Sequence, residues 1–253
     1  MDTLYANARI AGTDKPQDLL VEEGRFTRIG EGLARELPAQ GYDMTGIETV
    51  DLNGKLVCPP FCDTHLHLDY VFTARKPGAA NESGTLFEGI QRWSDTKADL
   101  TVDEVKTRAR KAVAMELRHG VQYIRSHADV TDPNLTSLKA LLELREELKD
   151  VVTIQIVSFP QEGMYSYRGP HGETGAELVE EGLRMGADCV GGIPHYEACR
   201  EFGERSMHTV VDLAVKYGRL IDVHCDETDD PNSRFVELLA ALAHAEGIGE
   251  MTT

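Results

Sequence analysis

The sequence predicts an α/β protein built on a parallel sheet, and two observations support this class. Apolar, β-branched segments alternate with amphipathic helical patterns from residue 55 onward. After a long first excursion, the segments begin at residues 123, 153, 189 and 220, a spacing of 30 to 36 residues that is typical of a βαβ unit. Continuously apolar strands that alternate with helices indicate a parallel sheet buried on both faces.

The first 55 residues have a different pattern. Four short apolar stretches separated by glycines, at residues 4–10, 19–22, 26–29 and 50–52, are typical of a small antiparallel β unit. We therefore predict two parts, a β unit over residues 1–55 and an α/β domain over residues 56–253.

Within the α/β domain the expected strands cover residues 55–58, 123–125, 153–159, 189–193 and 220–223. Helices are expected at residues 101–120, 134–149, 174–185, 206–217 and 233–246. Thr101 and Glu104 fit a capping box, in which the two residues satisfy each other's free amides. Phe87 and Trp93 lie on a further amphipathic pattern and are expected in the core.

Composition and charge exclude several classes of partner. The chain of 253 residues contains 26 Lys and Arg but 43 Asp and Glu, a formal net charge of −17. A field of that sign repels phosphate backbones and anionic lipid, so we expect no nucleic-acid polymer and no membrane as partner. No apolar run approaches the length of a membrane-spanning helix, about 18 residues. The amino terminus lacks the basic segment and apolar core of a signal peptide.

The five cysteines indicate a reducing compartment. They are odd in number and lack tight spacing, which does not describe a disulfide framework. We expect free thiols and a cytoplasmic location. Cys58 and Cys62 could form half of a metal site, but no second cysteine pair completes it.

Polar residues with catalytic potential follow the strands. The five clusters are His65 and His67; Arg125, His127 and Asp129; Gln161 and Glu162; His195; and His224, Asp226 and Glu227. In (β/α) barrels and in open parallel sheets, ligands bind at the carboxyl ends of the strands. This placement predicts an enzyme site that does not depend on any one motif.

His65-Leu66-His67 is the sharpest local feature. Residues i and i+2 of an extended chain point to the same side, so the two imidazoles form half of a metal site. His224 follows a later strand and could complete a set of three. Glu227, three residues further on, is placed to move protons beside a metal. Its neighbours Asp226, Asp229 and Asp230 are alternatives for that role.

Two further patterns refine the expected site. Arg125, His127 and Asp129 share one strand face, where ion-paired packing is favoured over metal ligation. A two-metal hydrolase needs a bridging ligand, usually a modified lysine or a carboxylate on the fourth strand. Residues 189–193 contain neither, which favours a single divalent ion, iron or zinc.

Four segments together resemble the bacterial cytosine deaminases of the amidohydrolase superfamily. They are residues 56–69 (LVCPPFCDTHLHLD), 83–93 (SGTLFEGIQRW), 159–163 (FPQEG) and 220–227 (LIDVHCDE). The resemblance implies a (β/α)8 barrel of the TIM type with one divalent metal, and a small β-sandwich portion at residues 1–55. It implies that His65, His67 and His224 bind the metal and that Glu227 is the catalytic acid and base. It also implies that Gln161 and the backbone carbonyl of Leu86 contact the substrate.

The sequence departs from this family in length. Family members continue into a sixth strand with another histidine and an eighth strand with an aspartate ligand, whereas this sequence stops after about five βα units. We therefore interpret it as a fragment or as the product of a truncated gene.

The resemblance implies hydrolytic deamination of free cytosine to uracil and ammonia, in nucleobase salvage, by a protein that is a homo-oligomer at full length. Three alternatives stay open. The substrate could be another amino-heterocycle, such as isoguanine, creatinine or an s-triazine. The chain could be an inactive product. A metal-free lyase or aldolase would need a lysine on a strand, and no expected strand beyond Lys55 has one.

Overall fold

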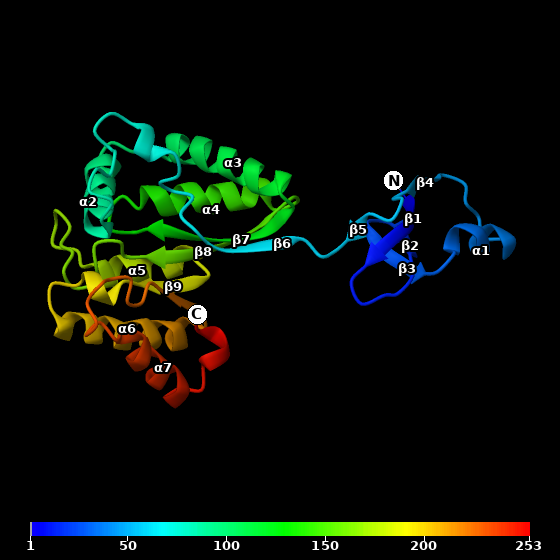
Figure 1. Ribbon diagram of the computed structural model, residues 1–253. Helices are drawn as coiled ribbons and strands as arrows, with labels where there is room; N and C mark the ends of the chain where they lie inside the picture. The colour runs from blue at the N-terminus through cyan, green and yellow to red at the C-terminus, as the bar shows by residue number, and fades with distance from the viewer. Residues whose placement is uncertain (1) are drawn as a thin grey trace. The chain divides into compact units, whose positions relative to one another are not determined.

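The chain divides between Pro60 and Phe61 into two units in this computed structural model, which describes residues 2–253 (Figure 1). The sequence places the boundary after residue 55 instead. The difference arises because Leu56–Val57 forms a strand, β5, that pairs with β1 (Asp2–Ile10) of the first unit.

The first unit contains a mixed sheet, whereas the sequence predicts an antiparallel one. Its other elements are β2 (Gln17–Glu22), β3 (Arg25–Gly30), α1 (Leu33–Ala39) and β4 (Ile47–Asp51). Strand β1 pairs antiparallel with β2 but parallel with β4 and β5. A parallel neighbour requires a crossover, and the short helix α1 lies on that connection. Leu37 of α1 packs with Leu4 and Leu20 to form the core of this unit.

The second unit contains a parallel sheet of five strands, with the order β10-β9-β8-β7-β6. The strands are β6 (Phe61–Leu66), β7 (Val121–Asp129), β8 (Thr153–Phe159), β9 (Cys189–Gly192) and β10 (Leu220–Val223). Its helices are α2 (Leu86–Lys97), α3 (Val102–Arg118), α4 (Thr136–Leu148), α5 (Gly175–Met185), α6 (Arg200–Tyr217) and α7 (Phe235–Ala245). Three short 3-10 helices are η1 (Thr73–Arg75), η2 (Pro194–Tyr196) and η3 (Gly249–Met251).

The prediction that residues 55–58 form the first strand of the α/β domain is wrong. That strand is β6, which begins after Pro59 and Pro60. Proline has no amide hydrogen to donate to a sheet, so the two prolines separate β5 from β6. Consequently His65 lies within β6, and His67 follows its end directly.

The sheet of the second unit is strongly curved. A flat sheet would hold β6 and β10, its two outer strands, roughly 19 Å apart at the usual spacing of neighbouring strands. Instead, Nε2 of His67, which follows β6, lies 3.2 Å from Nε2 of His224, which follows β10. Arg125 of β7 likewise donates to Asp222 of β10 at 2.8 Å. The sheet therefore forms part of a (β/α) barrel whose concave face carries polar side chains.

The helices cover the outside of this curved sheet, and α2 lies at the carboxyl ends of the strands (Figure 1). The Thr101 hydroxyl accepts from the Glu104 amide at 3.3 Å, as the predicted cap requires, whereas the Glu104 carboxylate pairs with Lys76. Trp93 is buried as predicted. The same prediction for Phe87 is wrong, because its side chain is 53% exposed. No helix among residues 2–253 is both long and apolar enough to cross a membrane.

Candidate metal centre and active site

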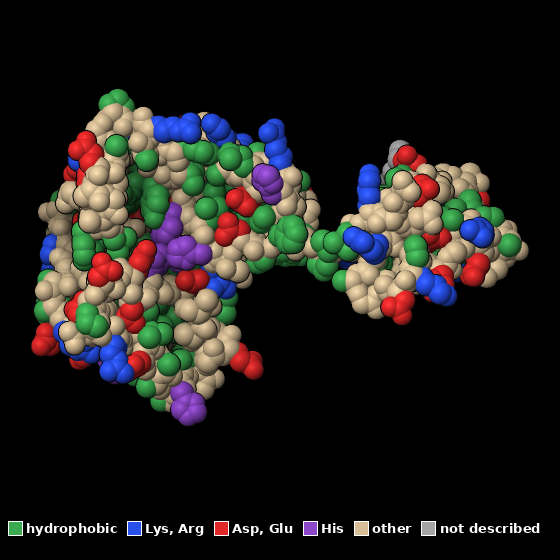
Figure 2. All heavy atoms as spheres, viewed as in Figure 1, with side chains coloured by type: hydrophobic (Ala, Val, Ile, Leu, Met, Phe, Trp, Pro, Cys, Tyr) green, Lys and Arg blue, Asp and Glu red, His purple; other side chains and the backbone are tan. Residues whose placement is uncertain are grey.

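Four histidines gather at the carboxyl ends of the barrel strands. His65, His67, His127 and His224 each offer a ring nitrogen, and these nitrogens all lie within 4.8 Å of one another. Figure 2 shows histidine side chains clustered in the middle of one face of the larger unit. The three histidines predicted to bind metal therefore lie together. His127, for which packing was favoured over ligation, is the fourth member of the group.

Burial favours the neutral form of His67 and His224. The pKa of His224 is lowered to about 3, first by desolvation and then by the neighbouring rings of His127 and His65. The pKa of His67 is well below its usual value, first through desolvation and then through the same neighbours. Nδ1 of His67, His127 and His224 is buried without a hydrogen-bond partner among the described residues. Neutral, unpartnered imidazoles in one group are the donors that a divalent ion requires.

The Asp222 carboxylate orients His127 within this group and also pairs with Arg125. Nε2 of His127 lies 3.2 Å from Oδ1 of Asp222, and Arg125 donates to the other carboxylate oxygen at 2.8 Å. The favoured ion-paired packing is found for Arg125. Its partner Asp222 comes from β10, three positions away from β7 in the sheet order, so the contact depends on the curvature. The carboxylate and histidine arrangement is common around metal ligands.

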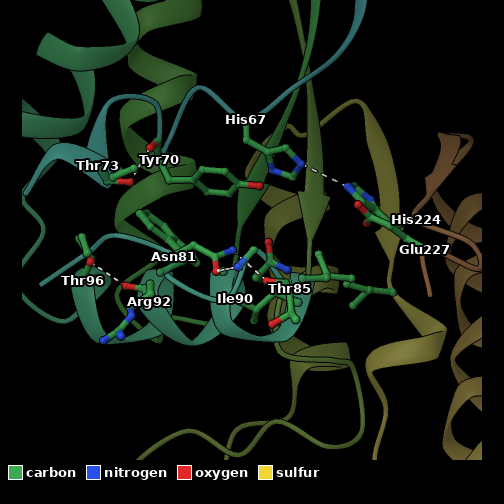
Figure 3. A pocket seen from close by; sticks show the side chains of 18 of the residues that line it. His67, Tyr70, Thr73, Asn81, Thr85, Ile90, Arg92, Thr96, His224 and Glu227 are labelled. Carbon is green, nitrogen blue, oxygen red and sulfur yellow. Dashed lines mark hydrogen bonds between the residues drawn. The ribbon is translucent and has the colours of Figure 1, made fainter. Parts of the chain in front are cut away.

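A cavity of about 650 Å³ opens beside the histidines. Its walls include His65, His67 and His224 together with Glu227, Gln161 and Leu86. Figure 3 shows His67 and His224 joined by their contact, with Glu227 next to His224 on the same side of the cavity. The volume is in the range of small-molecule sites, about 300 to 1,000 Å³. All six residues singled out from the sequence thus line one space.

The residues around Glu227 separate it from its acidic neighbours. Glu227 is exposed at the cavity. Asp226 instead accepts from the Ser233 hydroxyl and from the backbone amides of Phe235 and Val236, which begin α7. These bonds occupy the Asp226 carboxylate, so Glu227 is the better placed of the two for proton transfer.

His195 and Glu162 are among the residues of the strand-end clusters that do not line the main cavity. His195 lines a second, smaller cavity with Glu197 and Asp230. Glu162 pairs with Lys97 of α2. Because both residues follow strands, the sequence places them near the site, but their side chains do not point into the main cavity.

Sequence reasoning missed several residues of the cavity wall. The Tyr70 ring stacks on His67 with a centroid distance of 4.5 Å, and it also contacts Trp93 at 5.0 Å. Asn81, Thr85 and other residues of α2 and the loop before it complete the wall (Figure 3). Asn81 and Thr85 lie far beyond the end of β6, so the strand-end rule could not find them, and Tyr70, which follows β6 closely, was missed because a phenol ring gives no metal-binding signal. Only the segment at residues 83–93 pointed to this region.

A curled parallel sheet with a histidine group at its carboxyl end defines a (β/α)-barrel protein whose centre can hold a metal ion. The comparison with protein families narrows this class, because the model of the amidohydrolase family matches residues 48–251. The chain belongs to that family, and the family assignment made from the sequence motifs is confirmed.

The proteins that the chain resembles are named for different heterocyclic substrates. The chain is 44% identical to 5-methylcytosine deaminase from Klebsiella pneumoniae, whose crystal structure with 5-fluorocytosine matches with a TM-score of 0.88 over 98% of this chain and 57% of that one. It is 30% identical to N-isopropylammelide isopropyl amidohydrolase of Pseudomonas sp., over 100% of this chain and 60% of that protein. Pterin deaminase of Rhizobium rhizogenes is 26% identical, over 88% and 50%. The chain thus spans 50% to 60% of the length of these relatives.

Proposed function

We propose that this protein hydrolytically deaminates a free nucleobase, with cytosine converted to uracil and ammonia. The observation that carries the proposal is that the histidine group, Glu227 and Gln161 line the same cavity. The 44% identity to a 5-methylcytosine deaminase supports a pyrimidine with an exocyclic amine at carbon 4.

The proposed metal ligands are His65, His67 and His224, which would hold one divalent ion, iron or zinc. Such an ion, when bound, supplies Lewis acidity that lowers the pKa of a coordinated water toward neutrality. The lowered pKa values of His67 and His224 support this assignment, because a protonated imidazole cannot bind a cation.

Glu227 is the proposed proton carrier. It would accept a proton from the attacking water and deliver it to ring nitrogen 3, which makes carbon 4 electrophilic. The water oxygen then bonds to carbon 4, the bond from carbon 4 to the exocyclic nitrogen breaks, and ammonia leaves with the second water proton. Gln161, which is 5% exposed, would read the amide edge of the ring, and the Leu86 carbonyl would contact its other side.

The metal assignment predicts the metal content of two variants. In a chain continued through an eighth barrel strand, His65→Ala and His224→Ala each remove one of three imidazoles, so we expect both variants to lose most of the bound ion. Elemental analysis of the purified protein measures this. His119→Ala, which alters an exposed histidine at the end of α3, is the matched control and should keep its metal. Full metal content in both site variants would overturn the assignment.

The proton-transfer role predicts that Glu227→Gln slows turnover while metal stays bound. Loss of general acid and base help typically costs about 10²- to 10⁴-fold in rate, and we expect the upper end because one residue serves several transfers. Asp229→Asn alters an exposed acid of the same loop and should have little effect. Ammonia release is the readout. A nearly normal kcat in Glu227→Gln would assign proton transfer to another group.

The similarity to N-isopropylammelide amidohydrolase and to pterin deaminase favours a second class of substrate, other amino-heterocycles. Turnover of cytosine, 5-methylcytosine, isoguanine, creatinine, an s-triazine amine and pterin under the same conditions separates the two. Cytosine and its 5-methyl form should rank first. A higher kcat/KM for a triazine or a purine-like ring would contradict the cytosine assignment but keep the deaminase chemistry.

A further inference from the structure

Helix α2 forms one wall of the main cavity. Leu86, Ile90, Trp93 and Thr96 of this helix all line the space, and Figure 3 shows the helix opposite His67 and Tyr70. Only Ile90 and Trp93 of the helix are buried. The wall is therefore carried by a helix that has a small apolar contact with the rest of the barrel.

The two ends of the buried side of α2 are held differently. Ile90 packs in a small apolar cluster with Val157, Phe159, Cys189 and Ile193, which lie on or directly after the strands. Near its carboxyl end, the helix is held by polar contacts instead. The Trp93 indole donates from Nε1 to Oδ2 of Asp129 at 2.7 Å, one turn before Lys97.

Lys97 is the centre of these polar contacts. Its ammonium donates to Oδ2 of Asp129 at 3.0 Å and to the Thr131 hydroxyl at 2.8 Å, and it also pairs with the Glu162 carboxylate. Ser94 of α2 donates to the same Glu162 carboxylate at 3.0 Å. Every partner of the helix in this group lies on β7, β8 or the loops that follow them.

The Lys97 ammonium is buried between two carboxylates, those of Asp129 and Glu162. The Lys97 side chain is 11% exposed and that of Asp129 is 1% exposed. Burial alone lowers the pKa of an ammonium, yet the Asp129 and Glu162 carboxylates hold the pKa of Lys97 above its usual value. Removal of the Lys97 ammonium would leave the buried Asp129 carboxylate without a counter-ion.

Asp129 connects α2 with two other walls of the cavity. Its Oδ1 accepts from the Gln161 backbone amide at 3.4 Å as well as from Thr131. Its own amide donates to Asp69 at 2.9 Å, two residues after His67. Displacement of Asp129 or its counter-ion would therefore move the helix wall relative to Gln161.

We propose that Lys97 is a positioning residue that, through Asp129 and Glu162, locks α2 in place as the substrate-facing wall of the cavity. Lys97 itself contacts neither the proposed metal ligands nor the cavity. This inference rests on the proposed function only for the identity of the ligand. The placement of the wall depends on contacts within this chain alone.

Lys97→Met tests the proposal because methionine keeps the apolar stem and removes the ammonium. We expect amide hydrogen exchange to accelerate within α2 but not within α3 to α6. Trp93 is the only tryptophan of the chain, so its emission should shift as its Asp129 contact loosens. In a chain continued through an eighth barrel strand, KM for cytosine should rise about tenfold or more with kcat nearly unchanged, since misplaced contacts weaken binding before chemistry. Metal content should stay at the wild-type level.

Glu162→Gln is a second variant in case Lys97→Met does not fold, and it should show the same changes in weaker form because Asp129 still pairs with Lys97. Lys106→Met is the matched control. Lys106 also pairs with two carboxylates, Glu143 and Glu147, but on the outer helices α3 and α4. In Lys106→Met, the amide hydrogen exchange of α2, the Trp93 emission and KM should all match those of the wild type.

Three outcomes would overturn the inference. The first is unchanged exchange in α2 and unchanged Trp93 emission in both variants. The second is faster exchange spread equally over all helices, which would assign the ion group to general stability. The third is a loosened α2 with a wild-type KM. If no base of the substrate panel is turned over by a chain continued through an eighth barrel strand, the proposed function fails, whereas exchange and emission still decide the role of Lys97.

Discussion

At the scale of single residues, burial decides the chemistry of the site more than residue type does. The chain has nine histidines, and the four that gather at the strand ends are distinguished by their surroundings. His67 and His224 are neutral because water has been removed and other rings lie close. His119, in contrast, is exposed at the end of α3 and lies outside this group.

The low pKa of His224 predicts an acid-sensitive fold in the metal-free protein. The folded chain protonates this ring near pH 3, whereas the unfolded chain does so near the usual 6.5. Between these values the unfolded state binds more protons, so the His224 contribution to stability is complete above about pH 6.5 and is lost as the pH falls. Asp69 opposes this, because burial raises its folded pKa to about 7 and acidification below that value favours the folded state.

The comparison of His224→Gln with the wild type isolates the histidine contribution. Urea unfolding at pH 7 and pH 5 with a chelator present gives the free energy of unfolding. The wild type should lose more stability than His224→Gln over this interval, and His119→Gln should behave like the wild type. An equal loss in all three proteins would show that His224 does not titrate as its burial implies.

Single residues also show where sequence reasoning ends. The spacing of His65 and His67 fixes their common direction, so the pair could be predicted from one strand. His127 could not be assigned in the same way, because its role depends on how far the sheet curves and thus on distant residues such as Asp222. Gln161 and Glu227 were found because they are polar residues that follow strands, whereas Tyr70 also follows a strand but carries no signal for metal binding or proton transfer.

At the scale of elements, the strongest patterns were predicted best. The expected strands at residues 153–159 and 220–223 have the bounds of β8 and β10. Strand β7 extends four residues beyond its expected end, since the polar residues Arg125, His127 and Asp129 belong to the strand and face the barrel interior. The expected helix at residues 206–217 begins at Arg200 instead, because Gly203 obscures its first turns in the sequence pattern.

Gly203 explains how α6 fits against α7, and it predicts a destabilised variant. A Cβ atom at this position would lie 2.5 Å from the Phe235 ring and 2.7 Å from the Pro194 carbonyl oxygen. Overpacking in Gly203→Ala should lower the free energy of unfolding by about 1 to 3 kcal/mol. The higher helix propensity of alanine offsets roughly 1 kcal/mol of this loss.

Urea unfolding of Gly203→Ala measures this balance. Gly249→Ala is the matched control, because a Cβ atom there has nothing within 4 Å. The control should be neutral or slightly stabilising. A Gly203→Ala protein as stable as the wild type would mean that α7 moves away from α6 at little cost.

At the scale of the whole chain, the two units differ in how well the sequence describes them. The alternation of strand and helix is long and regular in the second unit, so its parallel sheet was predictable. In the first unit, antiparallel and parallel strands have the same short apolar pattern. The crossover helix α1 contains Pro38 and spans only seven residues, which leaves little signal for the mixed sheet.

The sheet of the second unit has two outer strands, and their edges predict the behaviour of a polypeptide of these 253 residues. On its outer edge, away from β9, strand β10 pairs only with the last two residues of the chain. The Thr253 amide donates to the Ile221 carbonyl at 3.0 Å, and Thr252 forms a bridge with Ile221. On the other side, β6 carries Phe61, which is 60% exposed. Incompletely paired strand edges and exposed apolar side chains favour association with another chain.

We therefore expect this polypeptide to self-associate and to show little deaminase activity, whereas a chain continued through an eighth barrel strand should be monodisperse and active. A closed barrel has no free edges, so closure removes the cause of association. Analytical ultracentrifugation over a range of concentrations, with ammonia release measured on the same samples, compares the two proteins. Elemental analysis of both shows whether the three imidazoles alone retain the metal. A monodisperse 253-residue polypeptide with activity comparable to the longer chain would show that the edges of β6 and β10 are already protected.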